Sequence, residues 1–208
     1  MNLAAALARM RRLNTSAFTT GDARAAFGGT TARASQTLAA LAQHGLAFSL
    51  RRGLWTLERD IDPLLLPEHL SSPAPSYVSL LTALFRHGVV EQIPAVVYAV
   101  TLGKTKRYQT SVGTFSLHRV SPEMFCGFEI TVEGIKLATI EKALVDVAYL
   151  SGTKTRLFAS LPEIELPRDF RFKRLEQYVA RIPSRRHRTL AAEWLERNVA
   201  PRRVVRRQ

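Results

Sequence analysis

The apolar positions near the N-terminus predict two short helices. Residues 2–10 have a helix-forming composition and a single apolar stripe. The next helix is expected to run from an N-cap at Thr20 to Phe27. Gly28 and Gly29 then interrupt the helical pattern, so a turn is predicted at this point.

A third predicted helix begins at the N-cap Thr30 and ends near His44, just before Gly45. Its apolar stripe is thin, and its clear members are Ala34, Leu38 and Leu41. The opposite face is polar, has no acidic residue, and carries Thr31, Arg33, Gln36, Thr37 and Ala40. Two helices joined by a short glycine-containing turn are typical of a helix-turn-helix.

The pattern after this helix alternates and predicts a β-hairpin. Residues 47–50 and 54–57 can pair around a turn that places Arg51 and Arg52 at the tip. The order of helices followed by a basic hairpin describes a winged helix-turn-helix. An ordinary packing module with a solvated helix face is the alternative.

A recognition helix must bury one side and offer the other to the major groove. Arg and Gln side chains there form hydrogen bonds with base edges, whereas Thr reaches phosphates or thymine methyl groups. Arginines at the wing tip would meet phosphates or the adjacent minor groove. The candidate DNA contacts in this domain are therefore Thr20, Thr30, Thr31, Arg33, Gln36, Thr37, Arg51 and Arg52.

Beyond a proline-rich segment the pattern is that of a mixed α/β domain. The predicted elements are a helix capped by Ser76 and closed by Gly88, strands over 95–102 and 114–120, a hairpin turning near Glu133-Gly134, and a helix from the cap Thr139 to Leu150. The two strands are expected to be joined by a basic loop containing Lys104, Lys106 and Arg107. That loop could contact DNA, RNA or a protein, or could simply be solvated.

Two further helices are predicted between residues 168 and 199. Ser184 caps the second of them, and Arg185, Arg186 and Arg188 crowd its first turn. Cations are unfavourable at that end of a helix unless an anion binds there, so these arginines are candidate phosphate contacts. The fold class is thus α+β, with an N-terminal winged helix-turn-helix followed by a mixed α/β domain with C-terminal helices. The predicted divisions are a DNA-binding domain over 1–59, a linker over 60–75, a second domain over 76–199, and a basic tail over 200–208.

The charge distribution favours a polyanionic partner. The formal net charge is +13, and it is +6 over residues 1–59, −2 over 60–150 and +9 over 151–208. Basic ends around an acidic middle favour nucleic acid, here double-stranded DNA, over a membrane surface. No apolar stretch approaches the roughly 20 residues that span a bilayer. The single cysteine excludes an internal disulfide and favours a cytoplasmic protein. No metal or cofactor motif is present, so no cofactor is expected.

Residues 10–155 resemble the AbiEi family of bacterial antitoxins. The run FTTGDARAAFG…RASQTLAALAQHGLAFSLRRGLWTL is similar to the DNA-binding half of that family, and SYVSLLTALFRHGVVEQIP and VVYAVTL to its C-terminal half. The segment ATIEKALVD, with the preceding GFE, carries the most specific similarity. The resemblance implies an antitoxin of a type IV toxin–antitoxin operon, whose winged helix represses the operon's promoter and whose remainder opposes a nucleotidyltransferase-like toxin.

The residues taken as candidates for the antitoxin function are Lys136, Glu141, Lys142 and Asp146. An i,i+4 ion pair would explain Lys142 and Asp146 without catalysis, and we predict no enzymatic activity. Direct toxin binding, modification of the toxin and protection of its target all remain compatible with the sequence. Two other classes stay open: a winged-helix regulator with an effector- or partner-binding domain, and a nuclease-like enzyme with clustered carboxylates.

Overall fold

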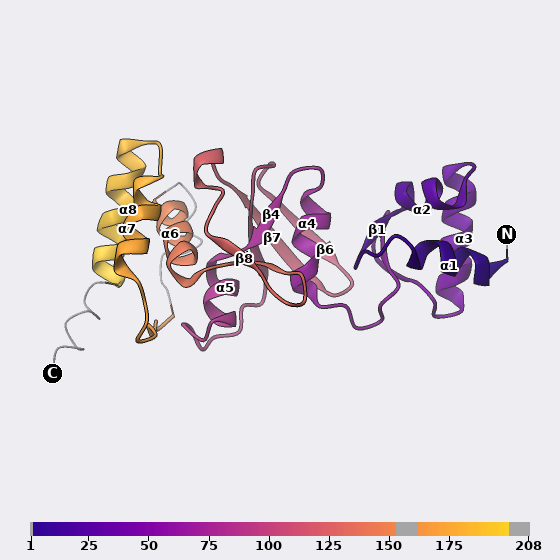
Figure 1. Cartoon of the computed structure of the whole chain (residues 1–208), viewed down its shortest axis with the longest axis horizontal. Helices are drawn as coiled ribbons and strands as arrows, with labels where there is room; N and C mark the ends of the chain where they lie inside the picture. Colours follow the sequence, from indigo (N-terminus) through magenta and orange to yellow (C-terminus); the bar gives the residue numbers. More distant parts are fainter. Residues whose placement is uncertain (1, 153–161, 200–208) are drawn as a thin grey trace.

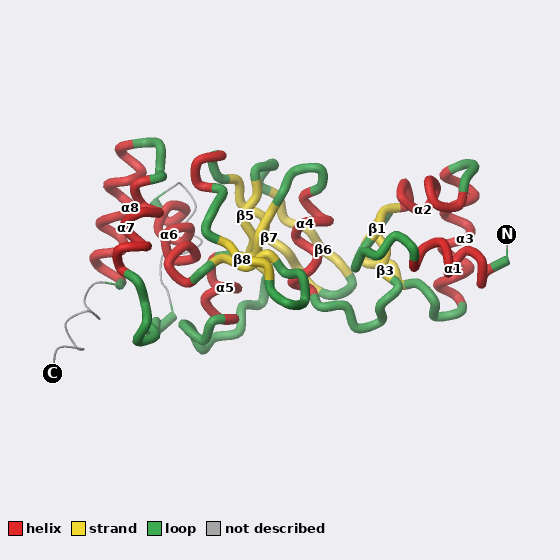
Figure 2. The backbone as a smooth tube through the Cα atoms, viewed as in Figure 1, coloured by secondary structure: helices red, strands yellow, loops and turns green. Residues whose placement is uncertain are grey.

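The N-terminal part of the protein is a winged helix-turn-helix, as predicted. The computed structural model describes residues 2–152 and 162–199. The first elements are α1 (Leu3–Arg11), β1 (Phe18–Thr19), α2 (Thr20–Phe27), α3 (Thr31–Gln43), β2 (Phe48–Arg51) and β3 (Leu54–Thr56). The strands form an antiparallel sheet in the order β1-β3-β2, and β2 and β3 are the wing. Helices α1, α2 and α3 lie at one end of the molecule, with β1 on the side toward the rest of the chain (Figures 1 and 2). Ala34, Leu38 and Leu41 are buried, as the apolar stripe predicted.

The start of α2 differs by one residue from the prediction. Thr19, not Thr20, is the N-cap: its hydroxyl accepts a hydrogen bond from the Asp22 amide at 3.1 Å, and the Asp22 carboxylate accepts one from the Thr19 amide at 2.7 Å. This reciprocal capping box holds Thr19 in an extended conformation that also pairs with Leu54. Thr20 is therefore the first residue of the helix, and its hydroxyl accepts a hydrogen bond from the Trp55 indole at 3.2 Å.

The segment predicted as a linker, residues 60–75, is folded. It contains a 3-10 helix, η1 (Pro63–Leu65), and the short helix α4 (Leu66–Ser71). Leu66 and Leu70 are buried in a cluster that also includes Leu50 and Leu54 of the wing and Phe115 of the second sheet. The four prolines of this segment favour an extended connection. The segment folds instead because burial of its leucines removes apolar surface from water. The segment thereby joins the winged helix to the sheet.

The second sheet has six strands and mixed pairing. Its strands are β4 (Ser76–Val78), β5 (Val97–Thr101), β6 (Lys106–Thr110), β7 (Gly113–Arg119), β8 (Phe128–Ile130) and β9 (Lys136–Ala138), in the spatial order β6-β7-β5-β4-β9-β8. The pairs β5/β7 and β4/β9 are parallel, and the other neighbours are antiparallel. A 3-10 turn, η2 (Pro122–Met124), precedes β8.

Helices flank this sheet and continue to the far end of the molecule. They are α5 (Leu80–Arg86), α6 (Ile140–Ser151), α7 (Phe172–Ala180) and α8 (Arg185–Asn198). Helix α6 contacts α5, α7 and α8, and it lies between the sheet and the two C-terminal helices (Figure 1). The winged helix and the α7–α8 pair therefore lie at opposite ends of an elongated molecule. The predicted caps Thr139 and Ser184 are both confirmed.

Two predictions about the middle of the chain are wrong. The helix expected to be capped by Ser76 begins only at Leu80, because Ser76–Val78 pair with β5 and β9 and form a central strand. The apolar spacing could not separate these states, since Tyr77 and Val78 suit a buried strand as well as a helix. The basic loop is also shorter than expected, because Lys106–Thr110 form an edge strand antiparallel to β7.

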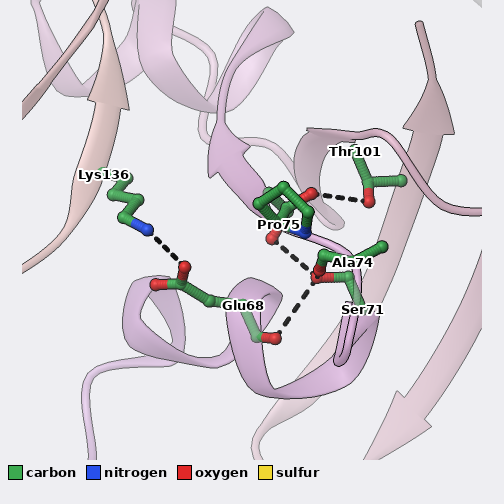
Figure 3. A network of polar contacts seen from close by, with 7 residues as sticks. Glu68, Ser71, Ala74, Pro75, Thr101 and Lys136 are labelled. Atoms are coloured by element: carbon green, nitrogen blue, oxygen red, sulfur yellow. Dashed lines mark hydrogen bonds and ion pairs between the residues drawn. The ribbon is translucent and has the colours of Figure 1, made fainter. Parts of the chain in front are cut away.

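Helix α4 is fixed to the sheet by polar contacts (Figure 3). Glu68 forms an ion pair with Lys136 of β9. The Ser71 hydroxyl lies 2.7 Å from the Ala74 carbonyl and 3.2 Å from the Glu68 carbonyl. The Thr101 hydroxyl donates to the Pro75 carbonyl at 2.9 Å, which ties the end of the segment to β5.

Two predictions concern membrane-spanning segments and the C-terminal tail. Within residues 2–152 and 162–199, none of the helices has the length and apolarity to cross a bilayer. The basic tail predicted over 200–208 lies outside the described residues.

His69 makes the junction between α4 and the winged helix sensitive to pH. Its imidazole lies 3.1 Å from the Ser16 hydroxyl, and burial lowers its pKa below 6.5, against an opposing effect of Glu68. Between about pH 6.5 and the lower pKa of the folded state, His69 binds more protons in the unfolded chain than in the folded one. The folded state therefore loses stability as the pH falls through this range. We expect the urea midpoint to fall between pH 7.5 and 5.5, and to fall less in His69→Gln. An unchanged pH dependence in that variant, equal to that of a His44→Gln control at an exposed site, would contradict this role.

Candidate functional site

The exposed face of α3 is the candidate DNA-reading surface. Thr31, Arg33 and Gln36 are exposed as predicted, whereas Thr37 is half-buried. The Thr37 hydroxyl donates to the Arg33 carbonyl at 3.0 Å, so its proton is already engaged within the helix. Thr30 is the N-cap, and its hydroxyl accepts from the Arg33 amide at 3.3 Å.

The burial pattern also adds residues that the sequence reasoning left out. Exposed α3 residues absent from the predicted set are Ala32, Ser35, Ala39 and Gln43, whereas Ala40 is half-buried. Counting the helical positions from the buried stripe at 100° per residue would have placed Ala32, Gln36, Ala39 and Gln43 on the outward side. The short side chains of Ala32 and Ala39 lie about one helical turn before and after Gln36, so the surface beside Gln36 is low.

The wing is held against the second sheet. Arg51 and Arg52 are exposed at the β2–β3 turn, where Gly53 has a φ of 82°. The Ser111 amide donates to the Leu50 carbonyl at 2.8 Å, and the Ser111 hydroxyl donates to the Ser49 carbonyl at 3.0 Å. The wing therefore has a fixed place beside the β6–β7 hairpin.

A shared aromatic ring brings the two basic segments together. The Arg51 guanidinium lies 5.1 Å, and the Lys106 ammonium 5.0 Å, from the centre of the Tyr108 ring. Such cation–π contacts attract both charges to one ring despite their mutual repulsion. No periodicity connects residue 51 with residue 106, so only the tertiary structure shows this proximity.

The three arginines of the α8 first turn are all exposed, but they are not equally free. Arg188 donates from Nε and Nη2 to the Ile182 carbonyl, at 3.1 and 2.9 Å, so part of its guanidinium is already engaged. These residues also lie at the opposite end of the molecule from α3 (Figure 1). The structure therefore does not bring the two groups of predicted DNA contacts together.

The segment ATIEKALVD contains a buried polar network. Lys142 and Asp146 form an ion pair one helical turn apart, which confirms the predicted i,i+4 pair, and their side chains are 1% and 0% exposed. The Tyr77 and Ser79 hydroxyls donate to the second Asp146 oxygen at 3.0 and 2.8 Å. Burial and the adjacent Asp146 carboxylate raise the pKa of Tyr77, so its phenol stays protonated and able to donate.

The preceding GFE segment packs directly on this network. The Gly127 carbonyl accepts from the Thr139 amide at 2.9 Å. A Cβ at Gly127 would lie 2.7 Å from the Tyr178 ring and 2.9 Å from Lys142 Cγ, and the φ of 75° also favours glycine. Phe128 stacks on Tyr77 with ring centres 4.8 Å apart. The most specific part of the family resemblance is thus one packed unit.

The remaining antitoxin candidates also make contacts within the protein. The buried Glu141 carboxylate accepts from the Arg171 amide at 3.1 Å, just before α7. Lys136 pairs with Glu68, as described above. The Lys142 and Asp146 side chains are shielded from solvent, so neither is available for direct contact with a partner protein. In the part of the chain that the structure describes, no three His, Cys, Asp or Glu side chains are arranged to hold a metal ion.

Comparisons with known proteins give no family assignment. No family model matches the sequence, and no curated protein does. Among solved structures, the antibiotic-resistance factor ANT(2'')-Ia, studied in solution, is similar over 70% of this chain and 95% of its own, with 12% identity and a TM-score of 0.31. A likeness of this size supports neither a fold nor a function.

The buried ion pair should dominate the stability of the second domain. Asp146→Ala leaves the Lys142 ammonium buried without its counter-charge, and we expect it to reduce the free energy of unfolding by about 3–5 kcal/mol. The double substitution Lys142→Met/Asp146→Leu should restore much of this loss, because no charge then remains buried. Urea unfolding measures both variants.

The matched control is Lys136→Ala, which breaks a partly exposed ion pair and should cost less than ~1 kcal/mol. An Asp146→Ala effect as small as that of the control would contradict a structural role for the network.

Proposed function

We propose that the protein is a DNA-binding antitoxin that represses its own operon and opposes a nucleotidyltransferase-like toxin. The observation that carries the DNA-binding half is the exposed, acid-free face of α3 beside a wing with Arg51 and Arg52 at its tip. A helix of this kind fits the major groove, and the wing arginines suit the flanking phosphates. The net charge of +13 favours the same partner.

The antitoxin half of the proposal rests on the sequence resemblance to the AbiEi family. Its most specific segments form the buried unit around Lys142, Asp146 and Gly127, so their part in antitoxicity would be to maintain the fold. A toxin would then have to bind exposed surfaces of the second domain, such as the β6–β7 hairpin. The proposal assigns the protein no catalytic activity of its own.

Binding to DNA from upstream of the protein's own gene tests the repressor function. We expect tighter binding to this promoter than to random DNA of equal length. Gln36→Ala should reduce the preference by roughly 5- to 150-fold, because a glutamine paired with one base contributes about 1–3 kcal/mol of discrimination. The control Gln177→Ala removes an exposed glutamine of α7 and should leave the preference unchanged. A wild-type protein without promoter preference at any salt concentration would contradict autorepression.

Co-expression tests the antitoxin function independently of DNA binding. When a nucleotidyltransferase encoded beside this gene is induced and arrests growth, the wild-type protein should restore growth. Gln36→Ala, expressed from an unrelated promoter, should restore it equally well, because the reading helix has no part in opposing the toxin. Failure of the wild-type protein to restore growth would contradict this half of the proposal.

A cleft favours a second candidate, a regulator that responds to an effector. The cleft has a volume of about 760 Å³ and lies between the winged helix and the β8–β9 turn. Its charged lining residues are Arg11, Glu58 and Glu133. A small polar effector bound there would contact both domains and could change their relative orientation. This candidate predicts promoter binding that responds to a metabolite and an absence of toxin neutralisation.

A further inference from the structure

A small cationic pocket lies beside the turn of the helix-turn-helix. It has a volume of about 390 Å³ and is lined by Arg9, Phe27, Gly28, Gly29, Arg33 and Thr37. The lining thus contains two arginines from different helices and no acidic residue. Neither arginine belongs to an ion pair among the described residues. Neither guanidinium is thus neutralised by a carboxylate of the described residues, which is an electrostatic setting that favours an anion.

Arg9 is already held in position. Its Nη1 donates to the Phe27 carbonyl at 2.9 Å and to the Ala26 carbonyl at 3.4 Å, at the end of α2. A guanidinium has five N–H donors in a fixed plane, so Nε and Nη2 retain three for a ligand. Because the side chain is anchored before any ligand binds, less rotamer freedom is lost when those donors are used.

Arg33, on α3, lies beside the same turn and lines the same pocket. Its Cδ would lie 3.9 Å from a Cβ at Gly29, so the side chain runs back along α3 toward the turn. The two glycines have φ values of 76° and 92°, and a Cβ at Gly28 would meet nothing within 4 Å. The pocket that the two glycines and the two arginines line, about 390 Å³, therefore has room for a ligand of modest size.

We infer that Arg9 and Arg33 form a clamp that holds one phosphate of the DNA backbone at this turn. The inference rests on the proposed DNA-binding function and deepens it, because it changes the role of Arg33. The sequence pattern placed Arg33 among the residues that read bases, whereas the clamp makes it a residue that provides affinity and register. Gln36, which lies elsewhere on the exposed face of α3, remains the reader of base edges.

The position of the pocket favours a DNA phosphate over a free anion. Arg33 of the clamp and Gln36 belong to the same helix, α3, and phosphates line the edges of the groove that such a helix enters. A phosphate contact fixes the helix relative to the duplex and carries no sequence information directly. Removal of either arginine should therefore weaken binding to all sequences alike.

The test compares binding to the promoter and to random DNA between 50 and 200 mM salt. Arg9→Ala and Arg33→Ala should each weaken binding to both DNAs by the same factor and leave the promoter preference unchanged. Because log K falls as log salt rises, the loss of one neutralised phosphate should make this negative slope shallower by about 0.9. The double variant should lose less than the product of the two single losses, because both side chains hold one phosphate.

Arg12→Ala is the matched control, since it removes an exposed arginine at the end of α1 that does not line the pocket. Its slope should stay close to that of the wild type. Arg9→Lys, which keeps the charge and loses the planar fork, should bind with intermediate affinity, and thermal unfolding of each variant separates lost binding from lost folding.

Three results would overturn the clamp. The first is an Arg9→Ala slope equal to that of Arg12→Ala. The second is a loss of promoter preference in Arg33→Ala that matches Gln36→Ala, which would make Arg33 a base reader. The third is an absence of wild-type DNA binding at every salt concentration. The third would also overturn the proposed repressor function, whereas the first two would leave that function intact.

Discussion

The buried ion pair between Lys142 and Asp146 is the constraint on which the second domain depends. Moving two charges out of water costs several kcal/mol for each, and their attraction offsets this cost only where the remaining lone pairs are satisfied. Tyr77 and Ser79 meet this condition by donating to the free oxygen of Asp146. The pair therefore fixes α6 against β4 and the start of α5.

The same network determines how the outer elements pack. The Lys142 stem leaves no room for a side chain at residue 127, so glycine there lets the chain before β8 approach both α6 and α7. Phe128 then stacks on Tyr77 and covers the network from the side of β8. The segments GFE and ATIEKALVD are in this way packed as one unit with Tyr77, which is distant from both in the sequence.

The winged helix is placed by a second set of contacts. Apolar residues of segment 60–75, which was predicted to be a linker, fill the space between the wing and the second sheet. Ser111 also hydrogen-bonds to the backbone of β2. A wing held on a folded domain presents its arginines in one arrangement, so under the proposed function less conformational freedom would be lost on binding to DNA. Under the proposed function, the second domain would affect DNA binding through this junction as well as opposing a toxin.

Much of the fold could be predicted from the sequence, because local signals specify it. The thin stripe of Ala34, Leu38 and Leu41 and the caps Thr30, Thr139 and Ser184 depend on residues only a few positions apart. Local signals failed at Tyr77 and Val78, because a strand and a helix would both bury these residues. They also failed at the start of α2, where two threonines follow each other and the N-cap is Thr19 rather than Thr20.

The candidate site depended far more on tertiary structure. The sequence by itself determined that a helix with a polar, acid-free face precedes a basic hairpin, since both follow from spacing and residue type. Only the tertiary structure decided that Arg188 caps a backbone carbonyl, that Lys142 and Asp146 are shielded, and that Arg9 and Arg33 line one pocket. Each of these facts is a contact between segments brought together by folding, and neither periodicity nor composition records which segments will meet.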